Sequence, residues 1–210
     1  MFRDAVLECR CGDVQGRVKD ASPRTVNRIV CYCDDCQAYA HHLKRPDLLD
    51  DRGGSDIVQV APAVLSFERG EDRLVGLRLM PRGLFRLYAR CCNTPMGNTL
   101  RPMIPFVGIV VAAFGKSGHG ADEFFGPPRG ANGTKFAVGG PPASSNSGNL
   151  RMMAHVLRLM LGWRLGGRAW PNPFFERATQ RPSRPITALT SDEREALRPL
   201  CGPNARAGAR

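Results

Sequence analysis

Seven of the eight cysteines fall into three tight groups, and these are the residues best suited to chemistry in this chain. The groups are Cys9-Arg-Cys11, Cys31-Tyr-Cys33-Asp-Asp-Cys36 and the adjacent pair Cys91-Cys92. Thiolates two or three residues apart on a tight turn converge on one ion, and tetrahedral sulfur coordination is typical of zinc. Residues 1–10 carry acids where an export signal has an apolar stretch, so we expect a cytoplasmic protein whose cysteines bind metal.

The number of thiolates indicates two unequal sites. Two closed zinc sites need eight thiolates, and the groups supply seven. One site is expected from the four cysteines Cys9, Cys11, Cys91 and Cys92. The other has only three, Cys31, Cys33 and Cys36. Three protein ligands with an open fourth position are typical of a catalytic zinc site, where a substrate thiolate could bind and be activated.

Two alternatives concern the ligand sets. Asp35, His41 or His42 could supply a fourth ligand to the three-cysteine site and make it structural, although both histidines are expected in a loop. Cys91 and Cys92 are adjacent, and adjacent side chains on an extended chain point to opposite faces. Both reach one ion only if the chain turns there. Cys201 is expected to be a free thiol.

The elements that must position these cysteines are mostly short strands. Runs rich in β-branched and aromatic residues predict strands over 5–9, 16–19, 26–30, 56–60, 84–88 and 106–114, and residues 65–79 predict a hairpin. A helix is predicted over 149–161, with Leu150, Met153, Leu157 and Leu161 on one apolar face that would pack on the β domain or form a dimer contact. A capping-box pattern, Thr190-Ser-Asp-Glu193, predicts a last short helix.

These elements predict a mainly β protein in three parts. Residues 1–125 form a zinc-binding β domain, and residues 126–148 form a Gly/Pro/Ser-rich linker. Residues 149–210 form a basic helical C-terminal extension. No apolar run reaches the roughly 18 residues that cross a membrane, so no membrane association is expected.

The positive charge is concentrated in the C-terminal part. The chain has 30 Lys and Arg against 19 Asp and Glu, a net charge of +11. Residues 1–125 account for +2 of it and residues 126–210 for +9. Arginines close to Trp163 and Trp170 suggest binding to nucleic acid or an acidic partner, but a solvated helix face is the more conservative interpretation.

The order of the motifs resembles a known family. Cys-x-Cys-Gly, then Cys-x-Cys-x-x-Cys-Gln, then Cys-x-Thr-Pro is similar to the glutathione-dependent formaldehyde-activating enzymes, a family that includes the centromere protein V proteins. The resemblance covers about residues 5–115. It implies a compact zinc-bound β-sheet fold, two zinc ions, and a carbon–sulfur lyase activity that joins formaldehyde to glutathione. For this chain we expect one or two zinc ions.

By this resemblance Cys31, Cys33 and Cys36 match the catalytic zinc motif, whereas Cys9, Cys11 and Cys92 match structural zinc positions. The chain departs from the family at its third motif, which usually ends Cys-x-x-Cys-Gly-Thr. Here Ala89 stands at the first cysteine, Asn93 stands at the glycine, and Cys91 is an additional thiol. The alternative to an enzyme is a binding module that zinc only stabilises, with the basic C-terminal part contacting its partner.

Overall fold

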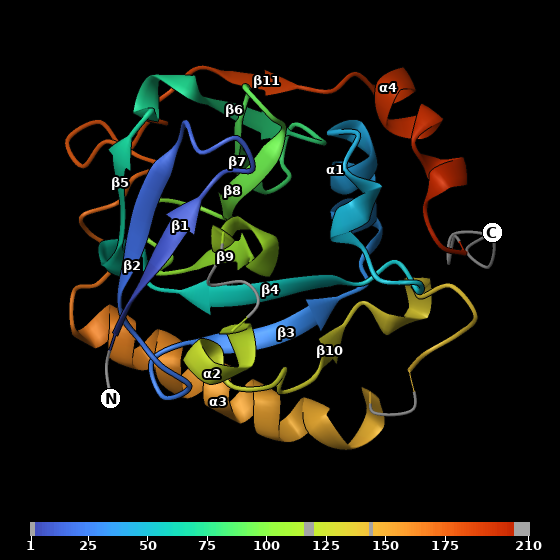
Figure 1. The fold of residues 1–210 in the computed structure, drawn as a ribbon, viewed down its shortest axis with the longest axis horizontal. Helices are drawn as coiled ribbons and strands as arrows, with labels where there is room; N and C mark the ends of the chain where they lie inside the picture. Colours follow the sequence, from blue (N-terminus) through green and yellow to red (C-terminus); the bar gives the residue numbers. More distant parts are fainter. Residues whose placement is uncertain (1–2, 116–119, 143–144, 204–210) are drawn as a thin grey trace.

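Two β-sheets and four α-helices make up the described part of the chain. The computed structural model describes residues 3–115, 120–142 and 145–203, with the backbone alone for residues 145–149. A three-stranded antiparallel sheet has the order β1-β2-β5 (Figure 1). Its strands are β1 (Arg3–Glu8), β2 (Gln15–Ala21) and β5 (Leu65–Arg69).

The larger sheet is mixed and has the order β10-β3-β4-β9-β8-β7-β6-β11. Its end strands β10 and β11 pair in parallel with β3 and β6, and the other pairs are antiparallel. The strands are β3 (Asn27–Cys31), β4 (Ser55–Val60), β6 (Leu74–Arg78), β7 (Phe85–Ala89), β8 (Thr94–Thr99), β9 (Val107–Val110), β10 (Ala131–Asn132) and β11 (Ile186–Ala188). The helices are α1 (Asp34–His42), α2 (Ala121–Phe125), α3 (Ser145–Leu165) and α4 (Ser191–Ala196).

The main hydrophobic core joins the two sheets. Leu7 of β1 and Val18 of β2 belong to the same buried cluster as Leu87 of β7. Phe174 and Phe175, from the C-terminal part, complete this cluster. Successive strand residues point to opposite faces, so the alternation on β7 sends Phe85, Leu87 and Ala89 into this core and its other residues toward α1.

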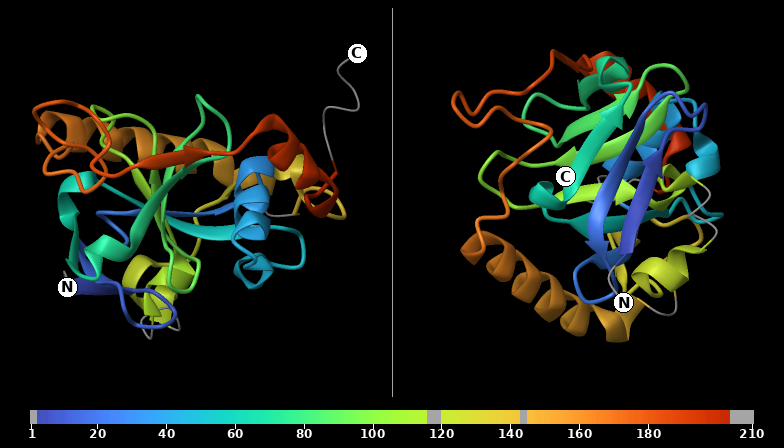
Figure 2. Two further views of the ribbon diagram at one scale, coloured as in Figure 1. Left: turned by 90° about the horizontal axis from the view of Figure 1, so that it is seen from above. Right: turned by 60° about the vertical axis from the view of Figure 1, so that its left-hand side comes forward.

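Helix α3 lies along the outside of the large sheet, close to β3 and β10 (Figure 2). Met152 packs with Ile29, Ile57 and the cysteines at the junction of β3 and α1. Leu159 and Trp163 pack on Ala61. The helix therefore attaches through a different face from the predicted one, since Leu150 and Leu157 point outward.

The mainly β prediction is wrong in its proportions, because the fold is mixed α/β. Residues 34–42 form α1, so His41 and His42 lie in a helix and not in a loop. The predicted hairpin over residues 65–79 is also wrong. Gly70, with a φ of 69°, and the 3-10 turn Glu71–Arg73 redirect the chain, so that β5 and β6 join different sheets.

The C-terminal part is built into the same unit. Residues 131–132 and 186–188 extend the large sheet at its two edges, and Phe174 lies in the main core. Whether residues 1–125 fold without these additions stays a prediction.

Within the described ranges, no helix is both long enough and apolar enough to cross a bilayer.

Candidate metal centres

The first cluster contains four cysteines, Cys9, Cys11, Cys91 and Cys92, whose sulfur atoms all lie within 4.8 Å of one another. The Sγ–Sγ distances are 3.2 Å from Cys11 to Cys91, 3.5 Å from Cys9 to Cys11, and 3.9 Å from Cys91 to both Cys9 and Cys92. A zinc–sulfur bond of about 2.3 Å implies tetrahedron edges of about 3.8 Å. These free thiols therefore have the spacing of a closed tetrahedral site.

Two turns bring the members of the four-cysteine cluster together. Cys9 and Cys11 lie on the β1–β2 turn, where Gly12 adopts a φ of 83° that a side chain would strain. Cys91 and Cys92 lie on the β7–β8 turn, where Asn93 has a φ of 55° in the left-handed region that Asn tolerates. The chain thus turns at the adjacent pair, and both sulfurs face the first two.

Thr94 fixes the sulfur of Cys92. Its Oγ1 accepts hydrogen bonds from the Arg10 amide at 3.0 Å and from Arg45 Nη1 at 3.3 Å. The hydroxyl proton is then free to be donated to Cys92 Sγ, 3.1 Å away. Burial raises the pKa of Cys92, but this bond, the Cys11 amide and the neighbouring thiols outweigh burial and lower the pKa to about 6. The surroundings therefore favour a thiolate, the form that binds metal.

The second cluster contains three cysteines at the junction of β3 and α1: Cys31, Cys33 and Cys36. Cys31 ends β3, Cys33 is the N-cap of α1, and Cys36 lies in the first turn of the helix. The Sγ atoms of Cys31 and Cys33 are 3.3 Å apart, again near the edge of a zinc–thiolate tetrahedron. Both clusters are thus geometrically able to bind metal ions such as zinc.

The three thiols of this cluster differ widely in pKa, mainly because of the hydrogen bonds among them and their burial. Hydrogen bonds to Cys33 and Cys36, with burial, raise the pKa of Cys31 far above its usual value. A bond with Cys31 lowers the pKa of Cys33, but Cys36 and burial outweigh it and raise the pKa to about 11. Bonds from the other two thiols, helped by the charge of Arg86, hold the pKa of Cys36 well below its usual value against burial. A divalent cation would stabilise all three as thiolates.

Arg86 of β7 is a fixed positive charge beside this cluster. The residue is only 1% exposed, and its guanidinium carbon lies 4.7 Å from the ring centroid of Tyr39 on α1. Its Nη2 has no hydrogen-bond partner among the described residues. Three thiolates and a divalent cation would carry one excess negative charge, and Arg86 would balance it.

No fourth protein ligand joins the three-cysteine cluster within the described ranges. Asp35 Oδ1 instead accepts a hydrogen bond from Arg194 Nη2 at 3.0 Å. His41 and His42 lie in the last turn of α1, the end of the helix farther from the cysteines. Cys201 is a free thiol outside both clusters, and burial raises its pKa to about 11.

A family model described as "Family of unknown function (DUF6151)" matches residues 1–185. The chain belongs to the DUF6151 family. The match includes both cysteine clusters and α3, and ends before α4. No curated protein matches the chain. The resemblance to the formaldehyde-activating enzymes rests on the cysteine motifs alone and stays a prediction.

In this DUF6151 protein a buried amide anchors the start of α1. Gln37 Nε2 donates to the carbonyls of Tyr32 at 2.7 Å and Phe136 at 3.0 Å. Its Oε1 accepts from the amide of Gly202 at 2.7 Å. One side chain thus ties the three-cysteine cluster to two segments far along the chain.

Arg194 of α4 supports the same helix from outside. Its Nη2 donates to Asp34 Oδ2 at 2.5 Å as well as to Asp35. Sequence reasoning missed Arg86, Gln37 and Arg194 as parts of the site, because each of them has a partner far along the chain: Tyr39 for Arg86, Gly202 for Gln37 and Asp34 for Arg194. The polar–apolar alternation of residues 85–89 was the one signal for Arg86, since a charge there faces away from the core.

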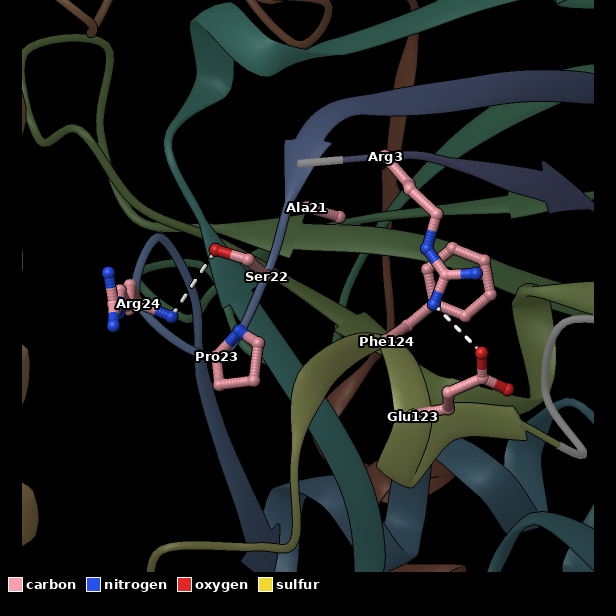
Figure 3. Close-up of a pocket in the computed structure, with 7 residues that line it drawn as sticks. All are labelled: Arg3, Ala21, Ser22, Pro23, Arg24, Glu123 and Phe124. Atoms are coloured by element: carbon pink, nitrogen blue, oxygen red, sulfur yellow. Dashed lines mark hydrogen bonds and ion pairs between the residues drawn. The ribbon is translucent and has the colours of Figure 1, made fainter. Parts of the chain in front are cut away.

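A cavity of about 510 Å³ lies apart from both clusters, between β1, the β2–β3 turn and α2 (Figure 3). Arg3 stacks over the Phe124 ring at 4.5 Å and pairs with Glu123 at 2.9 Å. Its charge is therefore already paired, and no cysteine lines the cavity. It is not the candidate site.

Proposed function

We propose that the protein binds two zinc ions with different roles. The four-cysteine cluster would hold a structural ion that joins the β1–β2 turn to the β7–β8 turn. The three-cysteine cluster would hold a second ion with an open fourth position. The unequal number of ligands, four and three, is the observation that carries this proposal.

We further propose that the open position makes the protein a zinc-dependent carbon–sulfur lyase acting on a thiol adduct of a small aldehyde. The motif resemblance supports glutathione and formaldehyde as the first pair to test. Sulfur would add to the carbonyl carbon, the C=O π bond would break, and the thiol proton would pass to the oxygen. Neither oxidation nor reduction is needed. A bound zinc ion would supply the Lewis acidity that keeps an incoming thiol deprotonated at neutral pH.

The surrounding residues support binding of one more thiolate. Four thiolates and a divalent cation would carry two excess negative charges, and Arg86 would offset one of them. The guanidinium is held in place by its stacking on Tyr39. Tyr39 in turn donates its hydroxyl to the carbonyl of Leu87 at 3.1 Å. Cys33 is only partly buried, whereas Cys31 and Cys36 are buried, so approach would be from the side of Cys33.

Metal analysis of the purified protein tests the first part. We expect two zinc ions per chain, and one each in Cys11→Ser and Cys33→Ser. Cys201→Ser is the matched control, because it removes a thiol outside both clusters and should keep two. Less than one zinc per chain, or no difference between Cys33→Ser and Cys201→Ser, would overturn the assignment.

The rate at which formaldehyde and glutathione combine, followed by exchange NMR, tests the second part. The parent protein and Cys201→Ser should accelerate the reaction, whereas Cys33→Ser, with its structural ion intact, should not. Equal rates for Cys33→Ser and the parent would remove the catalytic role and leave the metal sites standing.

The alternative, a zinc-stabilised module that binds nucleic acid, has weaker support. Stacking on bases needs an accessible aromatic ring, and Trp163 is only 5% exposed because it packs on Ala61. The outward positions of α3 carry leucines instead.

A further inference from the structure

Helix α3 presents an unpartnered apolar stripe to solvent. Large side chains three or four residues apart project from its outer side: Leu150, Met153, Leu157, Leu161 and Leu165. Leu150 is 83% exposed and Leu157 and Leu161 are each 59% exposed. The opposite side, with Met152, Leu159 and Trp163, is the one that packs on the sheet. Figure 2 shows the helix running along the outside of the molecule.

The charges beside this stripe are all positive. Residues 124–175 contain no Asp or Glu, and α3 and the residues just after it carry Arg151, Arg158, Arg164 and Arg168. None of these four arginines takes part in an ion pair among the described residues. The helix therefore combines unpaired cations with exposed leucines.

Two of these arginines line a cavity of about 360 Å³ next to the stripe, and Arg24 from the β2–β3 turn lines it with them. The other lining residues are Thr25, Leu159, Gly162 and Trp163, so the lining contains no acid. Three arginines around one cavity without an acid are suited to a phosphate group.

His155 holds one of the arginines in position. Its Nε2 lies 3.1 Å from the carbonyl of Val26, which can only accept, so Nε2 carries the proton. Its Nδ1 then accepts from Arg158 Nη2, 3.4 Å away. Arg158 directly follows Leu157 and lies three residues before Leu161, so it is next to the stripe on the helix surface. The cavity that Arg158 lines therefore borders the stripe.

We propose that α3 docks this protein on the surface of an anionic phospholipid bilayer. The leucine stripe would enter the boundary between headgroups and acyl chains, and the cavity of Arg24, Arg158 and Arg168 would receive a lipid phosphate. A basic helix with an apolar face lies in the membrane interface in this way, and each nearby arginine strengthens the attraction to anionic lipid. This departs from the sequence-based expectation of no membrane association.

Other occupants fit the surface less well. A second copy of α3 would bring its own unpaired arginines against these, with no acid on either helix to offset them. Nucleic acid would satisfy the arginines but would leave the leucines in water. The inference does not depend on the metal sites.

Flotation of the full chain with vesicles tests the proposal. We expect binding to phosphatidylcholine vesicles that contain phosphatidylserine, weakened by salt, and little binding to phosphatidylcholine alone. The double variant Arg158→Ala/Arg168→Ala should bind roughly 30-fold more weakly, at about fivefold for each arginine. Leu157→Ser/Leu161→Ser should lose roughly tenfold or more, because it removes the apolar contact.

The controls are an exposed leucine and an exposed arginine away from α3. Leu200→Ser and Arg82→Ala should bind like the parent, and all variants should melt like the parent because the changed residues are exposed. Equal binding to both vesicle types, or unchanged binding by both double variants, would overturn the proposal. So would a dimer in sedimentation analysis that Leu157→Ser/Leu161→Ser dissociates, or binding to a DNA duplex in preference to the anionic vesicles.

Discussion

Phe174→Ala tests whether the C-terminal part belongs to one cooperative unit with the cysteine-bearing strands. Phe174 is 0% exposed, and its ring packs edge-on against Phe85 with the centroids 5.8 Å apart. It also fills the space beside Gly97, where an added Cβ would lie 2.8 Å from Phe174 Cζ. Removing such a buried ring costs roughly 3–5 kcal/mol, because a cavity remains.

Thermal unfolding of the metal-loaded protein measures this cost. At about 2–4 °C per kcal/mol for a chain of this length, Tm should fall by roughly 6–20 °C. Leu165→Ala is the control from the same part of the chain, since that side chain is 80% exposed and its loss should change stability by about 0.5 kcal/mol or less. If Phe174→Ala lowers Tm no more than the control does, the reasoning is refuted, and residues 1–125 would then be an independently folded domain.

Three further predictions concern the surroundings of the three-cysteine cluster. Arg194→Ala removes two charge-assisted hydrogen bonds at the start of α1 and should lower the free energy of unfolding by at most roughly 1.5–3 kcal/mol for each bond. A chromophoric chelator should remove metal faster from Arg194→Ala than from the control Arg198→Ala, and equal rates would contradict the role of Arg194. Gly133→Ala places a Cβ 2.7 Å from the Cys33 amide nitrogen, whereas the Cβ of Gly139→Ala, at a similar positive φ, meets nothing within 4 Å. Metal titration should show weaker binding for Gly133→Ala alone, and equal affinities of the two variants would argue against this contact. Hydrogen bonds from Thr190 lower the pKa of Glu193, so Glu193 stabilises the fold above the ordinary carboxyl pKa and loses this effect as pH falls through the lowered pKa. Glu193→Ala should therefore unfold at lower urea concentration than the parent at pH 7 and at the same concentration in strong acid. A difference in stability that does not change with pH would contradict this.

Much of the sheet could be predicted from local sequence. The runs over residues 26–30, 56–60 and 84–88 correspond to β3, β4 and β7 within one residue at each end, because β-branched and aromatic side chains at those positions are buried. The capping box at Thr190 is present in α4. These features depend on neighbours a few residues away, which a sequence displays directly.

The remaining features depend on contacts between distant segments. The apolar periodicity of α3 was visible, but which face packs is decided by Met152 and Trp163 meeting β3 and Ala61. Likewise, the grouping of Cys9 with Cys91 needs the β1–β2 and β7–β8 turns to meet in space. The thiol count indicated that grouping, but it could not indicate that Asn93 provides the turn.

Because Gln37 bonds to Gly202, the two cysteine clusters are completed at different times during synthesis of the chain. All ligands of the four-cysteine cluster have been made once the ribosome reaches Cys92. The anchor of the three-cysteine cluster is complete only with Gly202, 110 residues later, which takes roughly 6–22 s at the usual rates of elongation. During that interval the nascent chain can close its first thiolate site while the second still lacks its supporting segments.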